Sequence, residues 1–396
     1  MYHYKKHPNS HQAGYTLVEL LVGAFIGLFL VAGMAQMYVS GKQTFNVSQS
    51  VGRAQEDLRF AYHFITRDLR ETSFTGCLRN VRNMIPAANR NNLNDLTIKI
   101  GGWDYDDTSP GDPDVTLDTN YAVSTQLGNW NGLDVDGSTD LPNFINSVAN
   151  SDVLMVRAIT PLDGAIVTAA GGTPNQTLGV NSPNAALAVD DVLVVGNCRV
   201  ADQFIVGSVN AGANVESIAN SFREDWGAGS RMIDISNTYY YIGLRNGADT
   251  PSLFRVSVTP NGPQSAAQEL VEGVESMQIL YGINTDANTA DANRYVSARD
   301  VNDWTQVVST RIGLILVQPD GRTPSVANVE TVSYGVIDDL NFVSSLGDTS
   351  LRFTSISTIK TRNLGTAPDF VLRVCNTDDP NGSRAAACNA NGFATF

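Results

Sequence analysis

The sequence predicts an α+β protein in which one long N-terminal helix packs on a large antiparallel β-sheet domain. An uncharged apolar run covers residues 20–41, and a helical apolar pattern continues beyond it to residue 71. After residue 72, short β-rich runs alternate with clusters of Gly, Asn, Asp and Pro, which is typical of strands joined by turns. At 396 residues, the chain is long enough to bury a substantial core.

Composition and charge exclude several classes of function. The chain is 42% hydrophobic and carries a net charge of −14, so its surface repels nucleic acid and no nucleic-acid partner is expected. Three of the four histidines precede Gly14, and only His63 follows it. Removal of residues 1–14 would leave 24 basic and 40 acidic residues, a net charge of −16, and one histidine. A multi-histidine metal site would then be impossible, and we expect no enzyme activity and no cofactor.

The apolar run predicts a single membrane span at about residues 17–39. Its 22 uncharged residues, 20–41, would extend roughly 33 Å as a helix, enough to cross a bilayer core. Lys5 and Lys6 precede the run, which orients the N-terminus to the cytoplasm and the rest of the chain to the periplasm. The small residue Gly14 comes before the apolar run, so cleavage after it would remove a basic leader, residues 1–14, and keep the anchor.

Glu19 is an acid at the start of this membrane segment. A carboxylate costs roughly 2.5–3.5 kcal/mol at the centre of a membrane helix and less near the interface, so it needs a partner. The α-amino group that cleavage would create on Tyr15 is one candidate, and that of another subunit is a second. The alternative is that the Glu19 side chain extends to the cytosolic interface of the membrane and has no specific role. Gly23 and Gly27 form a GxxxG pattern, which would let a neighbouring helix approach closely.

A helical seam continues beyond the membrane. Apolar residues recur there at alternating spacings of three and four: Val51, Ala54, Leu58, Ala61 and Ile65. We therefore predict one nearly continuous helix from about residue 16 to residue 71, on the order of 80 Å long. The seam is expected to pack on the globular domain, and a free coiled coil is the alternative.

The remaining chain, residues 72–396, is expected to be a β-rich periplasmic domain. Two sheet subdomains, at residues 72–210 and 230–365, are one possible organisation of this domain, followed by a tail at residues 366–396 that a disulfide would close. One helical segment is predicted at residues 267–274. Strands are predicted at residues 96–100, 152–159, 191–198, 203–209, 239–245, 252–258, 277–283, 311–317 and 351–362.

Four cysteines lie beyond the apolar segment, and none forms a CxxC pair. An even number on the far side of a membrane span predicts disulfides in an oxidising compartment. We favour Cys375–Cys388 as a local bridge, because short loops close at lower entropy cost, with Cys77–Cys198 as the long-range bridge. Free buried cysteines are the alternative.

An acidic stretch, residues 103–118, contains six aspartates and no basic residue. Asp104, Asp106 and Asp107 are weak candidates for calcium ligands. If Asp104 were the first ligand of an EF-hand loop, Ser109 would stand where glycine is required and Val115 where the bidentate glutamate belongs. The stretch is therefore predicted to be a solvated surface loop without a metal.

The segment "GYTLVE", followed by the long apolar helix, resembles the class III signal of type IV pilins and type II secretion pseudopilins. This resemblance implies that a prepilin peptidase cleaves between Gly14 and Tyr15 and that Tyr15 is N-methylated. It also implies that Glu19 pairs with the N-terminus of a neighbouring subunit during assembly. The chain departs from the usual pattern at Tyr15, where phenylalanine is common, and at Gln36, where major pilins often carry proline.

Longer phrases are similar to the PilW family of large minor pilins. They are "RAQEDLRFAYHFITRDLRETSFTGC", "DDVLVVGNCRVADQFIVGSV" and "ELVEGVESMQILYGI". The resemblance extends to about residue 363, is thinnest over residues 79–150, and implies a type IV pilin-like fold. It further implies a minor pilin that helps to initiate type IV pilus assembly in a tip complex, with other minor pilins, the major pilin and a tip adhesin as partners.

Two alternative functions stay open. One is a type II secretion pseudopilin similar to GspJ, although this chain is far longer. The other is a membrane-anchored periplasmic binding module.

Overall fold

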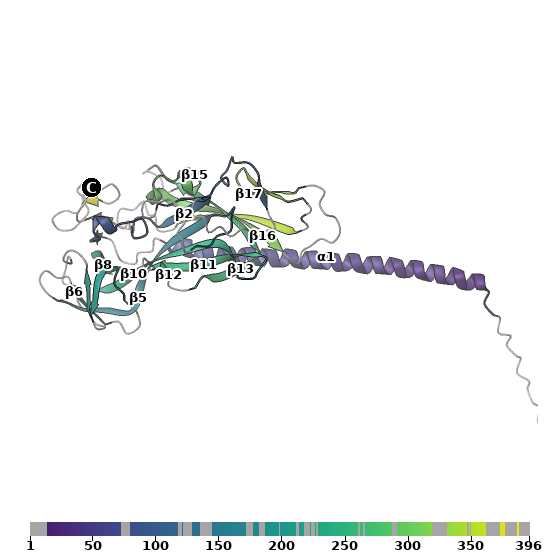
Figure 1. Ribbon diagram of the computed structural model, residues 1–396, viewed down its shortest axis with the longest axis horizontal. Helices are drawn as coiled ribbons and strands as arrows, with labels where there is room; N and C mark the ends of the chain where they lie inside the picture. Colours follow the sequence, from purple (N-terminus) through teal and green to yellow (C-terminus); the bar gives the residue numbers. More distant parts are fainter. Residues whose placement is uncertain are drawn as a thin grey trace, which may run out of the picture. The chain divides into compact units, whose positions relative to one another are not determined.

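The computed structural model describes most of the chain (Figure 1). The described residues are 14–72, 80–117, 121, 129–134, 145–171, 177–181, 187–197, 199–210, 214–217, 222, 226, 229–259, 262–263, 266–286, 291–318, 331–346, 348, 350–361, 373–376 and 386–387. By internal contacts, the chain separates into two compact units, one ending at Arg53 and the other beginning at Ala54.

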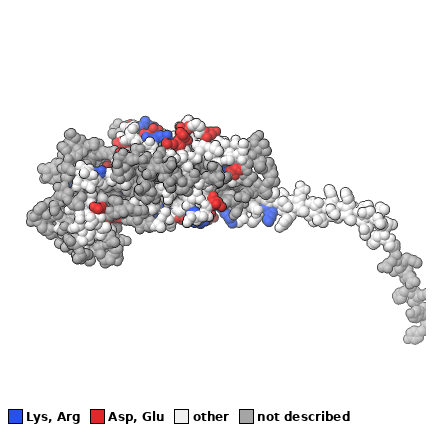
Figure 2. Space-filling view, viewed as in Figure 1, with Lys and Arg blue, Asp and Glu red and all other residues white. Residues whose placement is uncertain are grey.

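Helix α1 is Leu17–Glu71, within one residue of the predicted start and at the predicted end. It contains no proline, so no backbone hydrogen bond is lost along its 55 residues. Its most apolar 18-residue window has a mean hydropathy of 2.4 and no buried residue, so the helix is long and apolar enough to cross a membrane. In Figure 2, the first part of the helix carries few charged side chains on the visible face.

The second part of α1 packs on the β-sheets along the predicted seam. Ala54, Leu58, Ala61, Ile65 and Leu69 are all at most 8% exposed, while Val51 is partly buried. Leu69 continues the seam by one further step of four residues. Polar contacts also connect this part of the helix to the sheets, because the Tyr62 hydroxyl donates to the carbonyl oxygens of Ile312 (3.0 Å) and Ser355 (2.7 Å).

The end of α1 is fixed by a side chain. Thr72 Oγ1 donates to the carbonyl oxygens of Lys99 (2.9 Å) and Arg157 (2.8 Å). These bonds tie the last turn to the largest sheet, where Lys99 precedes one strand and Arg157 lies in another. The helix therefore ends next to Thr72, whose side chain forms hydrogen bonds with residues outside the helix.

The described strands form three sheets (Figure 1). The largest has 14 strands: β1 (Asn80–Asn83), β2 (Ile100–Tyr105), β4 (Trp130–Gly132), β5 (Val153–Gly171), β6 (Thr177–Asn181), β7 (Val192–Gly196), β8 (Ala201–Asn210), β9 (Asn214–Ser217), β10 (Arg231–Leu244), β11 (Pro251–Thr259), β12 (Gly262–Pro263), β13 (Gln268–Glu272), β20 (Arg373–Asn376) and β21 (Ala386–Ala387). The second has the order β15 (Arg294–Val296), β14 (Val274–Ile283), β16 (Val307–Gln318), β19 (Leu351–Lys360). The third has the order β17 (Ser333–Ile337), β18 (Leu340–Ser344), β3 (Val115–Leu117). Three short 3-10 turns are described as well: η1 (Ala87–Asn89), η3 (Ala298–Asp300) and η4 (Trp304–Gln306).

The α+β fold predicted from the sequence is confirmed, and most strand pairs are antiparallel. Three of the exceptions join segments far apart in the sequence, since β1 pairs in parallel with β8 and β20, and β18 with β3. The fourth is the parallel pair of β20 with the nearby β21. The largest sheet also combines strands from both of the expected subdomains, because β5 pairs with β10 over residues such as Leu154 and Tyr240. The largest sheet therefore crosses the boundary between residues 72–210 and residues 230–365.

Two local predictions are wrong. Residues 267–274 are not helical: β13 occupies most of them and pairs with β11, so Leu253 lies opposite Val271. Gly273 then turns the chain at a positive φ of 88°, and a Cβ there would lie 2.6 Å from the carbonyl oxygen of Val317. Tertiary pairing thus overrides the helical propensity of "AAQEL".

The strand predicted at residues 96–100 begins only at Ile100, and residues 96–99 are turn or irregular. The reason lies in Arg157 of β5, which is buried. Its guanidinium donates to the carbonyl oxygens of Asn92, Asp95 and Ile98, among others. Carbonyls gathered around one cation cannot join a strand ladder, so this segment forms a loop instead.

Candidate functional site

The N-terminus of α1 is built around Thr16 and Glu19. The Thr16 backbone N–H and its hydroxyl both donate to Glu19 Oε2 at 3.0 Å, and the Glu19 N–H donates to Thr16 Oγ1 at 3.3 Å. This reciprocal pattern is a capping box, in which an N-cap residue and the residue three positions later satisfy each other's backbone donors. It explains why the helix begins at Leu17, and it sets the negative charge at the positive end of the helix dipole.

Glu19 therefore has a partner within its own chain, which the sequence reasoning missed. The sequence pattern that predicts this capping box is Thr-x-x-Glu immediately before an apolar run. Both donors from Thr16 use Oε2, and within the described residues no hydrogen bond to Oε1 is formed. A carboxylate has about four acceptor positions, so Glu19 can hold its cap and accept a further donor at the same time.

Gly14 and Tyr15 lie immediately before this cap. Both are outside the helix and exposed, with Tyr15 89% exposed, so the bond between them is accessible. Gly23 and Gly27 lie on the exposed first part of α1, where a Cβ at either position would meet no atom within 4 Å. No other part of this chain covers the two glycines within the described residues, so a neighbouring helix could pack against them.

The proposed disulfides lie largely outside the described residues, which exclude Cys77, Cys198 and Cys388. The backbone of Cys375 is in β20, paired with Arg82 of β1 on one side and with Ala386 on the other. On its other edge, β1 runs parallel to β8, with Val81 opposite Ala201.

The acidic stretch at residues 103–118 is the predicted surface loop only in part, because residues 103–105 and 115–117 form strands. Its first residues form β2, which pairs with β4 and β5, and both Trp103 and Asp104 are at most 1% exposed. Asp106 and Asp107 are exposed, as expected for surface positions. The prediction failed at Asp104 because its countercharge, Arg299, lies 195 residues away in the sequence.

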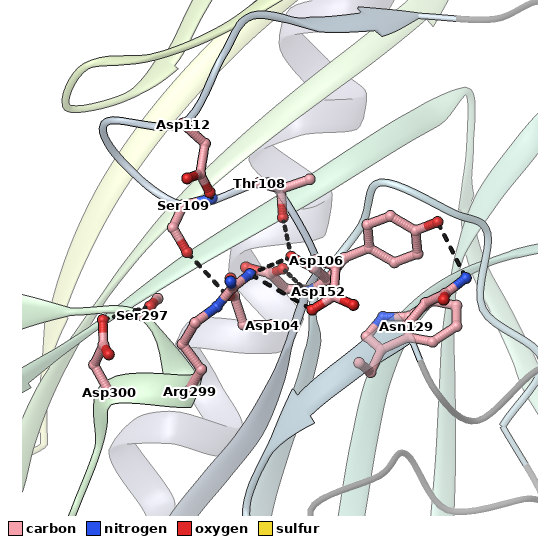
Figure 3. A network of polar contacts seen from close by, with 12 residues as sticks. Asp104, Asp106, Thr108, Ser109, Asp112, Asn129, Asp152, Ser297, Arg299 and Asp300 are labelled. Atoms are coloured by element: carbon pink, nitrogen blue, oxygen red, sulfur yellow. Dashed lines mark hydrogen bonds and ion pairs between the residues drawn. The ribbon is translucent and has the colours of Figure 1, made fainter.

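Asp104 is the centre of a buried polar network that joins β2 to η3. Its Oδ2 accepts from Arg299 Nε at 2.5 Å and from Ser109 Oγ at 2.9 Å. Arg299 Nη2 also donates to the carbonyl oxygen of Tyr105 at 2.9 Å. Figure 3 shows Asp104, Ser109 and Arg299 pointing toward one another. Burial raises the pKa of Asp104 to about 6, while Arg299 opposes this shift.

Asp152 extends the network to β14. It is 2% exposed, and its two oxygens accept the backbone N–H groups of Tyr105 (3.0 Å) and Ile279 (2.7 Å). Burial raises the pKa of Asp152 well above its ordinary value, and the charge of Asp104 adds to this shift. The two carboxylates therefore link β2, η3 and β14 through hydrogen bonds and an ion pair. Among the residues described, no group of three or more His, Cys, Asp or Glu side chains is arranged to hold a metal ion.

A second buried network joins β14 to β19. Arg352 donates to Glu275 through Nε (2.6 Å) and Nη2 (3.0 Å), and both side chains are 1% exposed. The same guanidinium contacts Asp348 at 2.5 Å, and the Tyr121 hydroxyl donates to Glu275 at 3.0 Å. Each charged group in this network has an oppositely charged neighbour, so we interpret the network as structural.

Comparison with known protein families identifies two segments. Residues 239–363 match type IV pilus-assembly protein W, PilW, and this segment runs from β10 through β19. Residues 9–35 match the prokaryotic N-terminal methylation motif, which covers Gly14, Tyr15, Glu19 and the first part of α1. No curated protein matches the chain. The resemblance to PilW and to prepilin-like N-termini that the sequence predicted is confirmed over these residues.

Proposed function

We propose that this type IV pilus-associated, pilin-like protein is a minor pilin that helps to initiate pilus assembly. It would act within a priming complex at the pilus tip, together with other minor pilins. The observation that carries the proposal is the coincidence of two features in one chain. An exposed Gly14–Tyr15 bond precedes a long apolar helix that carries Glu19 in its first turn, and residues 239–363 of the β-sheet domain match PilW.

Maturation would begin at this bond. A prepilin peptidase would hydrolyse the Gly14–Tyr15 peptide bond, releasing residues 1–14 and leaving a free α-amino group on Tyr15. This nitrogen would then exchange one proton for a methyl group taken from a separate methyl-donor cosubstrate. The new amine remains basic after methylation and is positively charged. It therefore supplies the cation that is missing from the apolar segment of the uncleaved chain.

Glu19 would then act as the assembly carboxylate. Its Oε2 is engaged by Thr16, so the side chain is already held in place and loses little freedom on binding. Oε1 would then accept a hydrogen bond from the α-amino group of a neighbouring subunit. Because an unpaired carboxylate is costly in the membrane, this ion pair favours the assembled state over the free subunit.

The location and partners follow from the same features. The helix would span the inner membrane once, with Lys5 and Lys6 on the cytoplasmic side and the β-sheet domain in the periplasm. The proposed disulfides, Cys77–Cys198 and Cys375–Cys388, suit that compartment. The proposed partners are the prepilin peptidase, other minor pilins, the major pilin and a tip adhesin.

The experiment is a deletion of the gene, with surface pili and secreted exoproteins counted in the same cells. The proposal expects pili to be lost and secretion to continue. Loss of secretion with normal pili would instead identify a secretion pseudopilin, and no change in either would identify a separate anchored module.

Complementation separates the charge of Glu19 from its capping role. Glu19→Gln keeps an acceptor at the third position of the capping box but removes the charge, whereas Thr16→Ala removes the N-cap and keeps the charge. The charge mechanism expects Glu19→Gln to insert into the membrane yet fail to restore pili, with Thr16→Ala largely competent. If Glu19→Gln restored pili and Thr16→Ala did not, Glu19 would act only through its capping hydrogen bonds.

A further inference from the structure

The face of α1 opposite the buried seam carries a row of basic side chains. Arg59, His63, Arg67 and Arg70 are spaced by four, four and three residues, so they lie on one side of the helix. All four are exposed. The row is about 16 Å long at the helical rise of about 1.5 Å per residue. We call these four residues the basic stripe.

The stripe borders a hollow in the surface of the domain. A cavity of about 830 Å³ lies against it, and its described lining residues all come from α1 between Arg59 and Glu71. Phe60, which is 52% exposed, stands beside the stripe and packs edge-on against Phe64 at 4.9 Å. Tyr62, whose hydroxyl is bonded to the neighbouring sheet, also lines the hollow. This surface is therefore rigid, cationic and partly aromatic.

The stripe carries more positive than negative charge, because its three arginines are accompanied by two exposed acids, Glu56 and Glu71. Arg67 pairs with Glu71 at 3.2 Å, but within the described residues Arg59 and Arg70 form no ion pair. Unpaired arginines gathered on one helix face are unexpected in a chain with a net charge of −14. The same face of a second copy would bring like charges together, which disfavours face-to-face self-association at this surface.

We propose that the basic stripe receives an acidic helix of a different membrane-anchored, pilin-like subunit. This inference rests on the proposed function and adds the partner's chemistry to it. A helix is indicated because the stripe is a straight row at helical spacing, which a partner helix can match with Asp or Glu at spacings of three and four. Arginine binds carboxylates in a two-bond, planar geometry, and Phe60 supplies an apolar contact beside the charges.

The anchor also favours such a partner. A subunit held in the same membrane by its own N-terminal helix would run alongside α1, with its residues beyond the membrane facing the stripe. Attraction between the stripe and an acidic neighbour would then select that neighbour over a second copy of this chain.

The test uses the full-length protein in its native membrane, with the photo-crosslinking amino acid p-benzoylphenylalanine in place of His63. Adducts are identified by mass spectrometry. We expect an adduct with another subunit that has a prepilin-like N-terminal helix and carboxylates at the crosslinked segment. The triple charge reversal Arg59→Glu, Arg67→Glu and Arg70→Glu should lower the adduct yield about tenfold or more.

A matched control reverses three exposed arginines elsewhere on the domain, with Arg231→Glu, Arg245→Glu and Arg294→Glu. It changes the net charge by the same amount and should leave the adduct unchanged. The four buried tryptophans, through their fluorescence, report whether each variant is folded.

An adduct with a second copy, an adduct with a neighbour lacking such carboxylates, no adduct at all, or a yield unaffected by the stripe reversal would each overturn the inference. Counts of surface pili distinguish failure of the docking proposal from failure of the proposed minor-pilin function. If deletion abolishes pili but the stripe variant restores them fully, the minor-pilin role stands and the stripe is not the docking surface.

Discussion

The buried ion pair between Glu275 and Arg352 allows a direct test of how the domain is held together. The two residues come from β14 and β19, which flank β16 in the second sheet. The guanidinium also contacts Asp348. In Arg352→Met, Glu275 and Asp348 would lose their shared cation while Glu275 stays buried.

The expected cost is large compared with the stability of a domain. Removing one partner of a buried ion pair costs about 3–5 kcal/mol, because the remaining charge is left uncompensated. A typical domain has a free energy of unfolding of about 5–15 kcal/mol. Glu275→Gln combined with Arg352→Met should cost less than the sum of the single changes, since the double variant leaves no charged glutamate behind.

The assay is urea unfolding of the detergent-solubilised full chain, followed by tryptophan fluorescence. All four tryptophans, Trp103, Trp130, Trp226 and Trp304, are buried in the β-sheet domain, so the signal reports that domain and not the anchor. Arg67→Met, which breaks the exposed pair with Glu71, is the control and should leave the midpoint unchanged. If Arg352→Met shifts the midpoint no more than this control, the reasoning about the buried network is refuted.

Three further outcomes are expected from the same unfolding assay. Arg157→Lys should destabilise the domain by about 3 kcal/mol or more, since lysine cannot replace several buried guanidinium hydrogen bonds; a wild-type midpoint would contradict this. Ile65→Ala, at a fully buried seam position, should cost about 2–5 kcal/mol, whereas alanine at the exposed His63 should cost little. Burial raises the pKa of Asp104 to about 6, and it raises the pKa of Asp152 well above its ordinary value. The folded state thus binds more protons than the unfolded state above pH 4, and this pair should make stability increase as pH falls from 7 toward 4. Asp152→Asn should flatten that dependence, and an unchanged slope would refute the assignment.

Local patterns were sufficient to predict α1. The seam repeats without interruption from Ala54 to Ile65, and no proline breaks the helix, so its bounds follow from the sequence within one residue. Strands with continuous apolar runs, such as β7 and β16, were found for the same reason. The capping box at Thr16 and Glu19 is equally local, because the Thr-x-x-Glu spacing before an apolar run predicts its hydrogen bonds.

Features that depend on distant residues were not predictable. Asp104 resembles a solvated acid until Arg299 is brought beside it by the fold. Residues 267–274 have helical composition, and only pairing with β11 makes them a strand. The parallel pairing of β1 with β8 and β20 likewise has no signature in any of the three segments taken alone. The contacts that decide Asp104 and β1 join residues 120 or more positions apart (Val81 with Ala201, Asp104 with Arg299), whereas the β11–β13 pairing is closer in sequence but depends on the turn between the strands.

The central claim is that this chain is processed and assembled as a pilin-like subunit, and its mature N-terminus tests that claim most directly. Mass spectrometry of the protein purified from its native membrane should find a chain that begins at Tyr15 and carries one methyl group on its α-amino nitrogen. A Gly14 substitution that blocks cleavage should yield only the uncleaved form and no pili. A native protein that retains residues 1–14 would contradict the account.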